Sequence, residues 1–141
     1  MSIQQKSLWI ILLSLQSIEL VLWAAEEDAS AKAMELLIEK KEAGFVNVRG
    51  ERRGFVQNQG ELSSRIKLYG EQEYLAIIGG EKDIEKLQLI IKDKKGNVVS
   101  QSDATQNYVS LTFTPPKKDK YTFLFLTPGK GGYYHFSLVT K

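Results

Sequence analysis

The chain has 141 residues, of which 43% are hydrophobic and 26% are charged. These values suit one globular domain and speak against a disordered chain. The formal net charge of +2 is close to zero, so charge alone indicates neither nucleic acid nor an anionic membrane as a partner. Cysteine is absent, which excludes disulfides, thiolate metal sites, cysteine nucleophiles and a lipidated cysteine.

Residues 1–25 have the layout of a secretory signal peptide. Lys6 supplies a positive charge, Leu8–Leu15 form an apolar block, and the small pair Ala24–Ala25 precedes an acidic stretch. We therefore expect cleavage after residue 25, export to the periplasm or the extracellular space, and no membrane span in the mature chain. The alternative is a retained anchor, but a spanning helix needs about 20 predominantly apolar residues. Glu19 would place a costly carboxylate among them.

Residues 26–44 are predicted to form an amphipathic helix with its C-terminal cap. Glu26–Ala43 lacks Pro and Gly and is rich in Ala, Glu, Lys and Leu, which are strong helix formers. Acidic residues crowd the first turn, lysines lie near the last, and Gly44 is suited to end the helix. This helix packs on its own domain, which is the usual case, or it binds a partner. Spacings of three and four residues place one stripe on it: Ala33, Met34, Leu37, Ile38 and Lys41.

From residue 45 to residue 141 the apolar period changes from 3.6 to 2, which predicts strands. Short strands separated by turn residues such as Gly79-Gly80 indicate a sandwich or a barrel rather than βαβ units. Alternation turns Leu87, Leu89 and Ile91 toward the core. We expect strands at Phe45–Val48, Gly54–Gln57, Ser64–Tyr69, Glu73–Ile78, Leu87–Lys92, Val98–Gln101, Tyr108–Phe113, Tyr121–Leu126 and Tyr133–Val139.

Two of these strands, Glu73–Ile78 and Tyr121–Leu126, are apolar on both faces. A strand that is apolar on both sides is covered on both sides. If the strands are neighbours in one sheet, their outward residues should form one patch with the helix lying across it. The residues of this expected patch are Leu75, Ile77, Ile90, Leu124 and Leu126.

Several segments between Tyr74 and Val139 follow one another in a characteristic order and spacing. They are YLAIIGG (74–80), DIEKLQLIIKDKKGNVV (83–99), FTPP (113–116), Asp119-Lys120-Tyr121 and GGYYHFSLV (131–139). In this order and spacing, residues Tyr74–Val139 resemble the bacterial pre-peptidase C-terminal (PPC) family, whose members are small β-sandwiches appended to, or secreted alongside, exported proteins. Asp119-Lys120-Tyr121 is then a variant, without glycine, of the family's Gly-x-Tyr strand. The resemblance implies an all-β sandwich of the jelly-roll or PPC-like kind.

The sequence departs from the family at a possible cation site. The family often has an Asp-Leu-Asp-Leu run before an Asp-x-x-Gly turn, and those carboxylates can approach a cation. Here the run reads Lys86-Leu87-Gln88-Leu89, and only the turn residue Asp93 is kept. Lysine offers donors and a positive charge, which oppose a cation. We therefore expect no calcium site, no other metal and no cofactor.

No residue pattern predicts catalysis. His135 is the single histidine, and it is expected on the outward side of the last strand as an ordinary surface residue. Catalysis would require a nucleophile or carboxylate partner, and a metal would require further nitrogen or sulfur ligands. The acidic residues Asp83, Glu85, Asp93 and Asp103 do not have calcium-loop spacing and are expected to be solvated turn residues.

The basic doublets Arg52-Arg53, Lys94-Lys95 and Lys117-Lys118 lie in separate predicted loops. Without exposed aromatic residues between them they are expected to be solubility charges, and no nucleic-acid partner is expected.

These observations together predict a non-catalytic binding or accessory module for a protein or glycan partner. The alternative is a purely structural cell-envelope protein, held in the membrane if the N-terminal helix is not cleaved. The outward tyrosines could form a stacking surface for sugar or peptide, although tyrosine is common in strands for propensity alone. The candidate partner surface consists of Tyr69, Tyr108, Tyr133, Leu124 and Leu126.

Overall fold

The computed structural model describes residues 23–141, and most of the predicted signal peptide lies outside them, in residues 1–22. The signal peptide therefore stays a prediction. In the described part, a helix at residues 23–41 is followed by eight strands. No helix in this part has the length and hydropathy needed to cross a membrane. The strands are β1 Asn47–Val56, β2 Glu61–Leu68, β3 Tyr74–Gly80, β4 Gln88–Lys92, β5 Val98–Gln101, β6 Tyr108–Phe113, β7 Asp119–Leu126 and β8 Gly132–Thr140.

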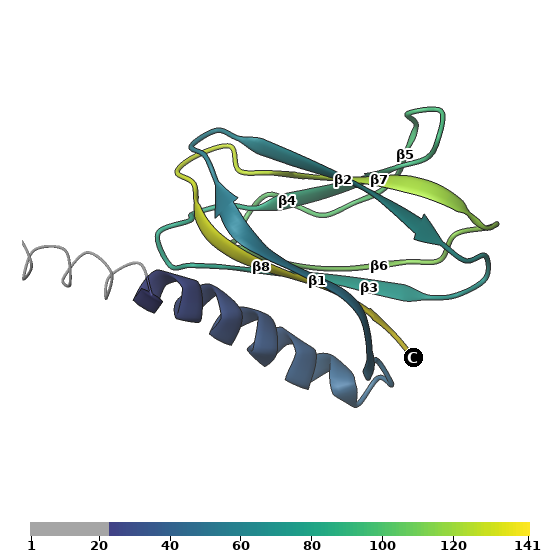
Figure 1. The fold of residues 1–141 in the computed structure, drawn as a ribbon, viewed down its shortest axis with the longest axis horizontal. Helices are drawn as coiled ribbons and strands as arrows, with labels where there is room; N and C mark the ends of the chain where they lie inside the picture. Colours follow the sequence, from purple (N-terminus) through teal and green to yellow (C-terminus); the bar gives the residue numbers. More distant parts are fainter. Residues whose placement is uncertain (1–22) are drawn as a thin grey trace, which may run out of the picture.

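The strands form two four-stranded antiparallel sheets that pack face to face (Figure 1). One sheet has the order β1-β8-β3-β6 and the other the order β2-β7-β4-β5. The helix lies along the outer face of the first sheet (Figure 1). We call this sheet the covered sheet and its partner the open sheet. This arrangement confirms the predicted all-β sandwich with one helix.

The core between the sheets consists of side chains that alternate along the strands. Leu87, Leu89 and Ile91 are buried there, as the period of two predicts. Aromatic rings from the two sheets meet edge to face, with centroids 4.5 Å apart for Phe125 and Tyr134. Such pairs add stability beyond the apolar area that they bury.

The first strand differs from the expectation. The two predicted strands Phe45–Val48 and Gly54–Gln57 are parts of one ten-residue strand, β1. The charged residues between them break the apolar alternation, which is why the pattern suggested two pieces. β1 is an edge strand, and its backbone pairs with β8 from Asn47 to Val56 whatever its exposed side chains are. Charges on an edge strand also discourage pairing with other chains.

The helix turns a stripe toward the sheet that overlaps the predicted one only in part. Ala33 is buried and Leu37 is half-buried against the helix cluster, as predicted, whereas Met34 is 56% and Ile38 64% exposed. Ala29 and Leu36, at most 3% exposed, are buried instead. One reason is close contact with the backbone of β3: a Cβ on Gly79 would lie 2.4 Å from the backbone nitrogen of Ala33, so small residues face the sheet at that point. Positions 29, 33 and 36 also have helical spacing, so periodicity alone allowed both stripes.

The expected single apolar patch is divided between the two sheets. Leu75 and Ile77 on β3 are fully buried under the helix, in a cluster that includes Leu36, Phe45 and Val139. By contrast, β4 and β7 belong to the open sheet, which the helix does not reach. The prediction that the helix covers all five residues was wrong, because β3 is not a neighbour of β4 or β7. The open sheet keeps Ile90, Leu124 and Leu126, which are half-buried on its outer face.

Candidate binding surfaces

The outer face of the open sheet changes from apolar to basic along its strands. Cross-strand partners share a face, so the register shows which side chains are neighbours. Leu124 lies between Ser63 and Ile90, and one step along the strands Thr122 lies between Arg65 and Lys92. A further step pairs Lys67 with Lys120. In the other direction along β7, Leu126 lies between Glu61 and Gln88. One end of the face therefore offers three half-buried aliphatic side chains among polar neighbours, and the other end offers cations.

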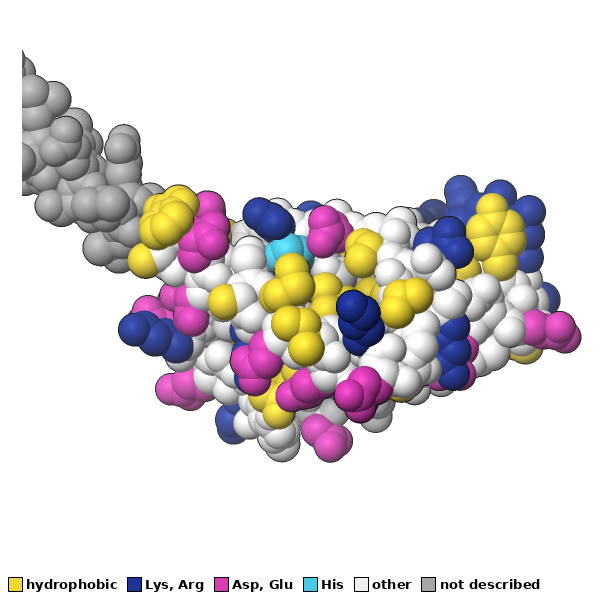
Figure 2. Space-filling view, turned by 90° about the horizontal axis from the view of Figure 1, so that it is seen from below, with side chains coloured by type: hydrophobic (Ala, Val, Ile, Leu, Met, Phe, Trp, Pro, Cys, Tyr) yellow, Lys and Arg dark blue, Asp and Glu magenta, His cyan; other side chains and the backbone are white. Residues whose placement is uncertain are grey.

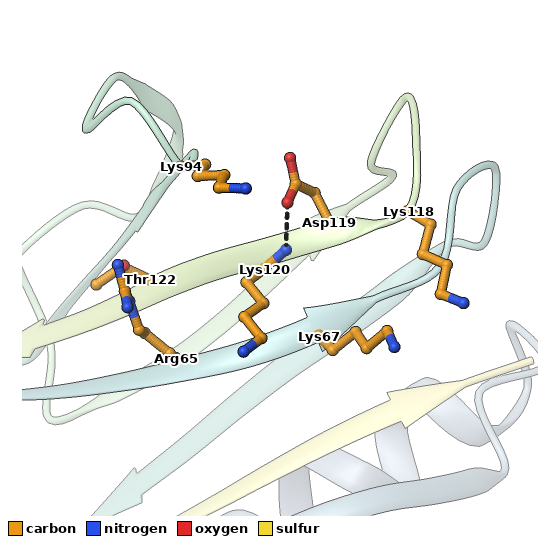
Figure 3. Close-up of a pocket in the computed structure, with 7 residues that line it drawn as sticks. All are labelled: Arg65, Lys67, Lys94, Lys118, Asp119, Lys120 and Thr122. Atoms are coloured by element: carbon orange, nitrogen blue, oxygen red, sulfur yellow. Dashed lines mark hydrogen bonds between the residues drawn. The ribbon is translucent and has the colours of Figure 1, made fainter.

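The basic end contains a hollow of about 440 Å³, which we call the basic hollow (Figure 3). It forms where the ends of β2 and β4 meet the start of β7. The Asp119 carboxylate accepts a hydrogen bond from the backbone N–H of Lys120 at 2.8 Å. The hollow is lined by Arg65, Lys67, Lys94, Lys118, Asp119, Lys120 and Thr122.

The five cations of the basic hollow are solvent-exposed. The ion pairs among the described residues include none of the five. Like charges held near one another repel, by about 1 kcal/mol for a pair 4 Å apart in water. The basic hollow therefore concentrates positive potential on a protein that is almost neutral overall.

The sequence did not predict this cluster. The doublets Lys94-Lys95 and Lys117-Lys118 do lie in separate loops, but these loops meet at the same end of the open sheet. The structure places one lysine of each doublet beside Arg65 and Lys67 of β2. The one local signal was the alternation of these two cations with Ile66, which points them to the same face.

The five predicted partner residues lie in separate places. Tyr69 is 57% exposed beside the basic hollow, with the Lys118 ammonium 5.1 Å from its ring centroid. Tyr108 and Tyr133 belong to the covered sheet, where Tyr108 packs against the helix cluster. Tyr133 meets Phe55 edge to face at 5.1 Å. Leu124 and Leu126 are on the open sheet, whereas Tyr69, directly after β2, borders a hollow at the edge between the two sheets.

The helix side has an apolar groove instead of a fully buried stripe. Four apolar side chains here are each at least half exposed: Met34 and Ile38 of the helix, Val46 just before β1, and Val48 on β1. They border a hollow of about 230 Å³. Figure 2, which looks at this side, shows hydrophobic side chains gathered near its centre, with both acidic and basic side chains among and around them. The apolar surface that the sequence assigned to packing is thus partly left in solvent.

His135 is buried, not exposed as expected, because the helix covers the outward face of β8. It is 6% exposed. Its Nδ1 lies 3.0 Å from the Ser30 hydroxyl and its Nε2 lies 3.4 Å from a Glu51 carboxylate oxygen. Hydroxyl, imidazole and carboxylate in series are the groups of nucleophilic catalysis. Ser30, however, is inside the helix, where backbone N–H groups are bonded to carbonyls four residues back and cannot stabilise an oxyanion. We interpret the contact as a polar link between helix and sheet.

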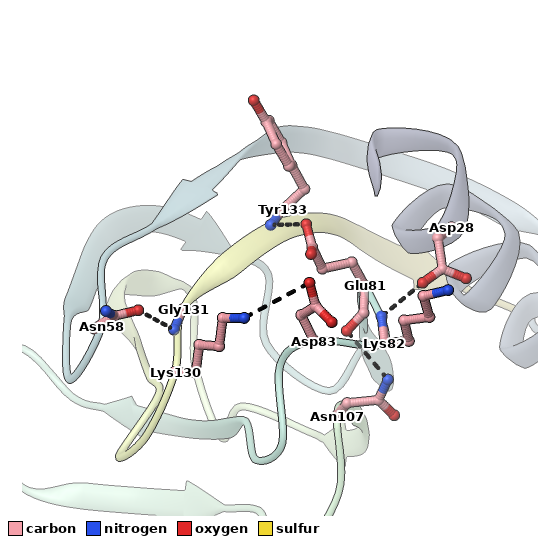
Figure 4. Close-up of polar contacts among 9 residues, drawn as sticks. All are labelled: Asp28, Asn58, Glu81, Lys82, Asp83, Asn107, Lys130, Gly131 and Tyr133. Carbon is pink, nitrogen blue, oxygen red and sulfur yellow. Dashed lines mark hydrogen bonds and ion pairs between the residues drawn. The ribbon is translucent and has the colours of Figure 1, made fainter. Parts of the chain in front are cut away.

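A second polar network holds the start of the helix and the start of β8 to the loop after β3 (Figure 4). The Asp28 carboxylate accepts a hydrogen bond from the backbone N–H of Lys82 at 2.6 Å. Glu81 is 8% exposed, and its carboxylate accepts the N–H of Tyr133 at 2.9 Å. Lys130 pairs with Asp83 at 3.8 Å. These carboxylates are engaged in holding loops together.

Asp93 shows the same structural use of an acid. Its carboxylate accepts the backbone N–H groups of Lys95 and Asn97, both at 2.9 Å. The bond from Asn97 is the main reason why the pKa of Asp93 is below its usual value. The side chain thus closes the β4–β5 turn. Among residues 23–141 no three His, Asp or Glu side chains gather in a way that could hold a metal ion.

The fold and its surfaces define a small β-sandwich module of PPC-like architecture, with one sheet covered by a helix and the other open. The sequence matches no protein-family model and no curated protein.

Solved structures show the same architecture. The pre-peptidase C-terminal domain of a collagenase from Bacillus anthracis aligns with a TM-score of 0.55 and 13% identity, over 66% of this chain and 90% of that chain. CorA, a surface-associated copper-binding protein of Methylomicrobium album BG8, aligns with a TM-score of 0.54 and 8% identity, over 64% and 93%. PliG, a periplasmic inhibitor of g-type lysozyme from Aeromonas hydrophila, aligns with a TM-score of 0.51 and 9% identity, over 70% and 90%. At these identities the likeness concerns the fold, and it confirms the PPC-like sandwich.

Proposed function

We propose that the protein is an exported, non-catalytic module that binds a protein or glycan partner through the outer face of the open sheet. One observation carries this proposal: the helix covers one sheet, while the opposite face stays open and joins an apolar half to a basic half. Binding interfaces commonly combine a desolvated apolar centre with a polar rim. Leu124 and Ile90 would form such a centre, and the cations of the basic hollow would form the rim.

The proposed surface keeps three of the five residues expected from the sequence. Leu124 and Leu126 are on the face itself, and Tyr69 stands at its basic end. Tyr108 packs against the helix cluster, with the Lys32 ammonium 4.4 Å from its ring centroid. Tyr133 packs against Phe55 and borders a hollow beside the helix. Two proteins of similar fold, a periplasmic lysozyme inhibitor and a domain of a collagenase, are compatible with an accessory role here.

We further propose that residues 1–25 are removed on export. The polar contacts that join the helix to the sandwich begin at Asp28, and the buried helix residues begin at Ala29. Cleavage after Ala25 would therefore leave the helix attached. Mass spectrometry of the native protein should find an N-terminus at Ala25 or Glu26. A membrane-bound protein with an intact Met1 would instead favour the structural envelope protein held by its N-terminal helix.

The binding proposal is tested by a matched pair of variants. Leu124→Ser alters the apolar half of the open face, and Ile38→Ser makes the same kind of change on the exposed side of the helix. Each protein is immobilised and exposed to an extract of the envelope of its own cells. A component retained by the wild type and by Ile38→Ser, but lost with Leu124→Ser, would support the proposal. Equal retention by all three proteins would refute it.

A further inference from the structure

We propose that the basic hollow binds the phosphate groups of a polyanion. This inference goes beyond the proposed function: it assigns a phosphate ligand to the basic end of the face whose aliphatic end would contact the protein or glycan partner. The shared chemistry is a chain or array of phosphate groups, whether they belong to a lipid surface or to a free polyphosphate.

The charges around the basic hollow are not balanced. Five cations line it together with one carboxylate, Asp119. The cations come from β2, β7, the β4–β5 turn and the loop before β7. The fold thus collects like charges from four segments, and none of them has an ion-pair partner among the described residues. A bound anion with several charges would remove this repulsion.

The cationic donors of the basic hollow are spaced along and across the strands. Lys67 and Lys120 are directly paired across β2 and β7, which places their Cβ atoms about 5 Å apart. Arg65 precedes Lys67 by two residues on β2, which places it about 7 Å away along the strand, since each residue advances about 3.3 Å. A volume near 440 Å³ far exceeds the roughly 30 Å³ share of one water molecule. The basic hollow therefore offers several donors to an extended anion rather than one tight site to a single ion.

The types of donor favour phosphate. The Arg65 guanidinium can bind two phosphate oxygens at once, and lysines bind phosphate as point charges. Thr122 lines the basic hollow beside Arg65 and adds a hydroxyl donor (Figure 3). A single-stranded nucleic acid would also need rings on which its bases stack. The lining residues include no aromatic ring, and the ring of the nearby Tyr69 already faces the Lys118 ammonium.

The experiment titrates sodium tripolyphosphate into the protein and measures heat. We expect saturable binding that weakens about tenfold or more between about 10 mM and about 150 mM salt, because the Debye length falls from about 30 Å to about 8 Å. The variant Lys67→Glu/Lys120→Glu should lose binding about tenfold or more. The control Lys82→Glu/Lys86→Glu changes two exposed lysines in the loop after β3 and should retain it. Both variants lower the formal charge from +2 to −2, since each exchange removes two charges.

Two further titrations identify the source of the ligand. Vesicles of phosphatidylglycerol in phosphatidylcholine, compared with phosphatidylcholine alone, report binding to lipid phosphate. Tighter binding to these vesicles than to tripolyphosphate, with the same loss in Lys67→Glu/Lys120→Glu, would indicate a membrane source and support the inference. Tighter binding of a poly-glutamate peptide than of tripolyphosphate would indicate an acidic peptide and overturn it.

The absence of saturable tripolyphosphate binding at low salt would overturn the inference, as would equal loss in both charge variants. These results would leave the proposed function standing if Leu124→Ser alone abolishes retention of an envelope component. If instead tripolyphosphate binds at the basic hollow but Leu124→Ser has no effect on retention, the inference stands and the apolar half of the proposed function fails.

Discussion

The contact between Gly79 and the helix gives the sharpest test of how the helix is attached. Gly79 lies on the outer face of β3, directly under the helix backbone. A Cβ at this position would lie 2.4 Å from the nitrogen of Ala33 and 2.5 Å from the carbonyl oxygen of Ala29. Contacts with carbon are normally about 3.5 Å or longer. Backbone atoms cannot rotate out of the way, so in Gly79→Ala the helix must move by about 1 Å.

This movement separates Leu36 from Leu75 and Ile77, which are buried beneath it. Overpacking of this kind costs about 1–3 kcal/mol of unfolding free energy. Alanine in a strand regains about 0.5–1 kcal/mol over glycine because it restricts the unfolded chain. We therefore expect a net loss of up to about 2.5 kcal/mol. For a protein of this size that corresponds to a fall in Tm of about 3–5 °C per kcal/mol.

Gly50→Ala is the matched control, because a Cβ on Gly50 would meet no atom within 4 Å. Gly50 does not have the left-handed backbone of Gly44 and Gly96, so alanine is free of strain there. This variant should be neutral or stabilised by about 0.4–1 kcal/mol. Urea unfolding of the three proteins measures the differences. If Gly79→Ala is as stable as Gly50→Ala, the helix does not rest on the backbone of β3 and the reasoning fails.

Three other predictions concern the core, alkaline pH and calcium. Leu36→Ala should lower the free energy of unfolding in urea by about 2–5 kcal/mol, the range for core leucines. Ile38→Ala, at an exposed site, should change it by about 0.5 kcal/mol at most. Similar losses in the two variants would mean that the face of the helix with Ile38 is buried as well. Burial raises the pKa of Tyr134 above its usual value of 10.0, against a smaller lowering effect of Arg52. The unfolded chain therefore ionises first, so the stability that Tyr134 provides is present below pH 10 and is lost as the pH rises through its folded pKa. Melts above pH 10 should fall less steeply for Tyr134→Phe than for the wild type, and parallel curves would count against this assignment. Thermal melts with calcium and with a chelator should coincide, because Lys86 and Gln88 stand where the PPC family often has carboxylates. A rise in Tm of several degrees with calcium would indicate a calcium site.

Local sequence was enough to predict the helix, most of the strands and the class of fold, although it split β1 in two. Leu89 and Ile91 alternate with Gln88 and Lys92, and this period of two is sufficient to assign an inner face. The Ala-, Glu- and Lys-rich stretch before Gly44 predicts a helix from propensity and capping alone. These features depend on residues a few positions apart, so they can be read without knowing which strands pair.

What covers each face was decided by the tertiary structure. His135 was expected in solvent because alternation shows which side of β8 it occupies, but not that a helix lies on that side. Apolar residues at helical spacing run both through Met34 and through Leu36, so the sequence allowed either side of the helix to face the sheet. The close contact between Gly79 and the helix backbone favours the side with Leu36. The basic hollow likewise joins Lys94 and Lys118 to Arg65 across long stretches of sequence. Periodicity assigns a side chain to a face, whereas contacts between distant segments determine whether that face is buried, charged or free to bind.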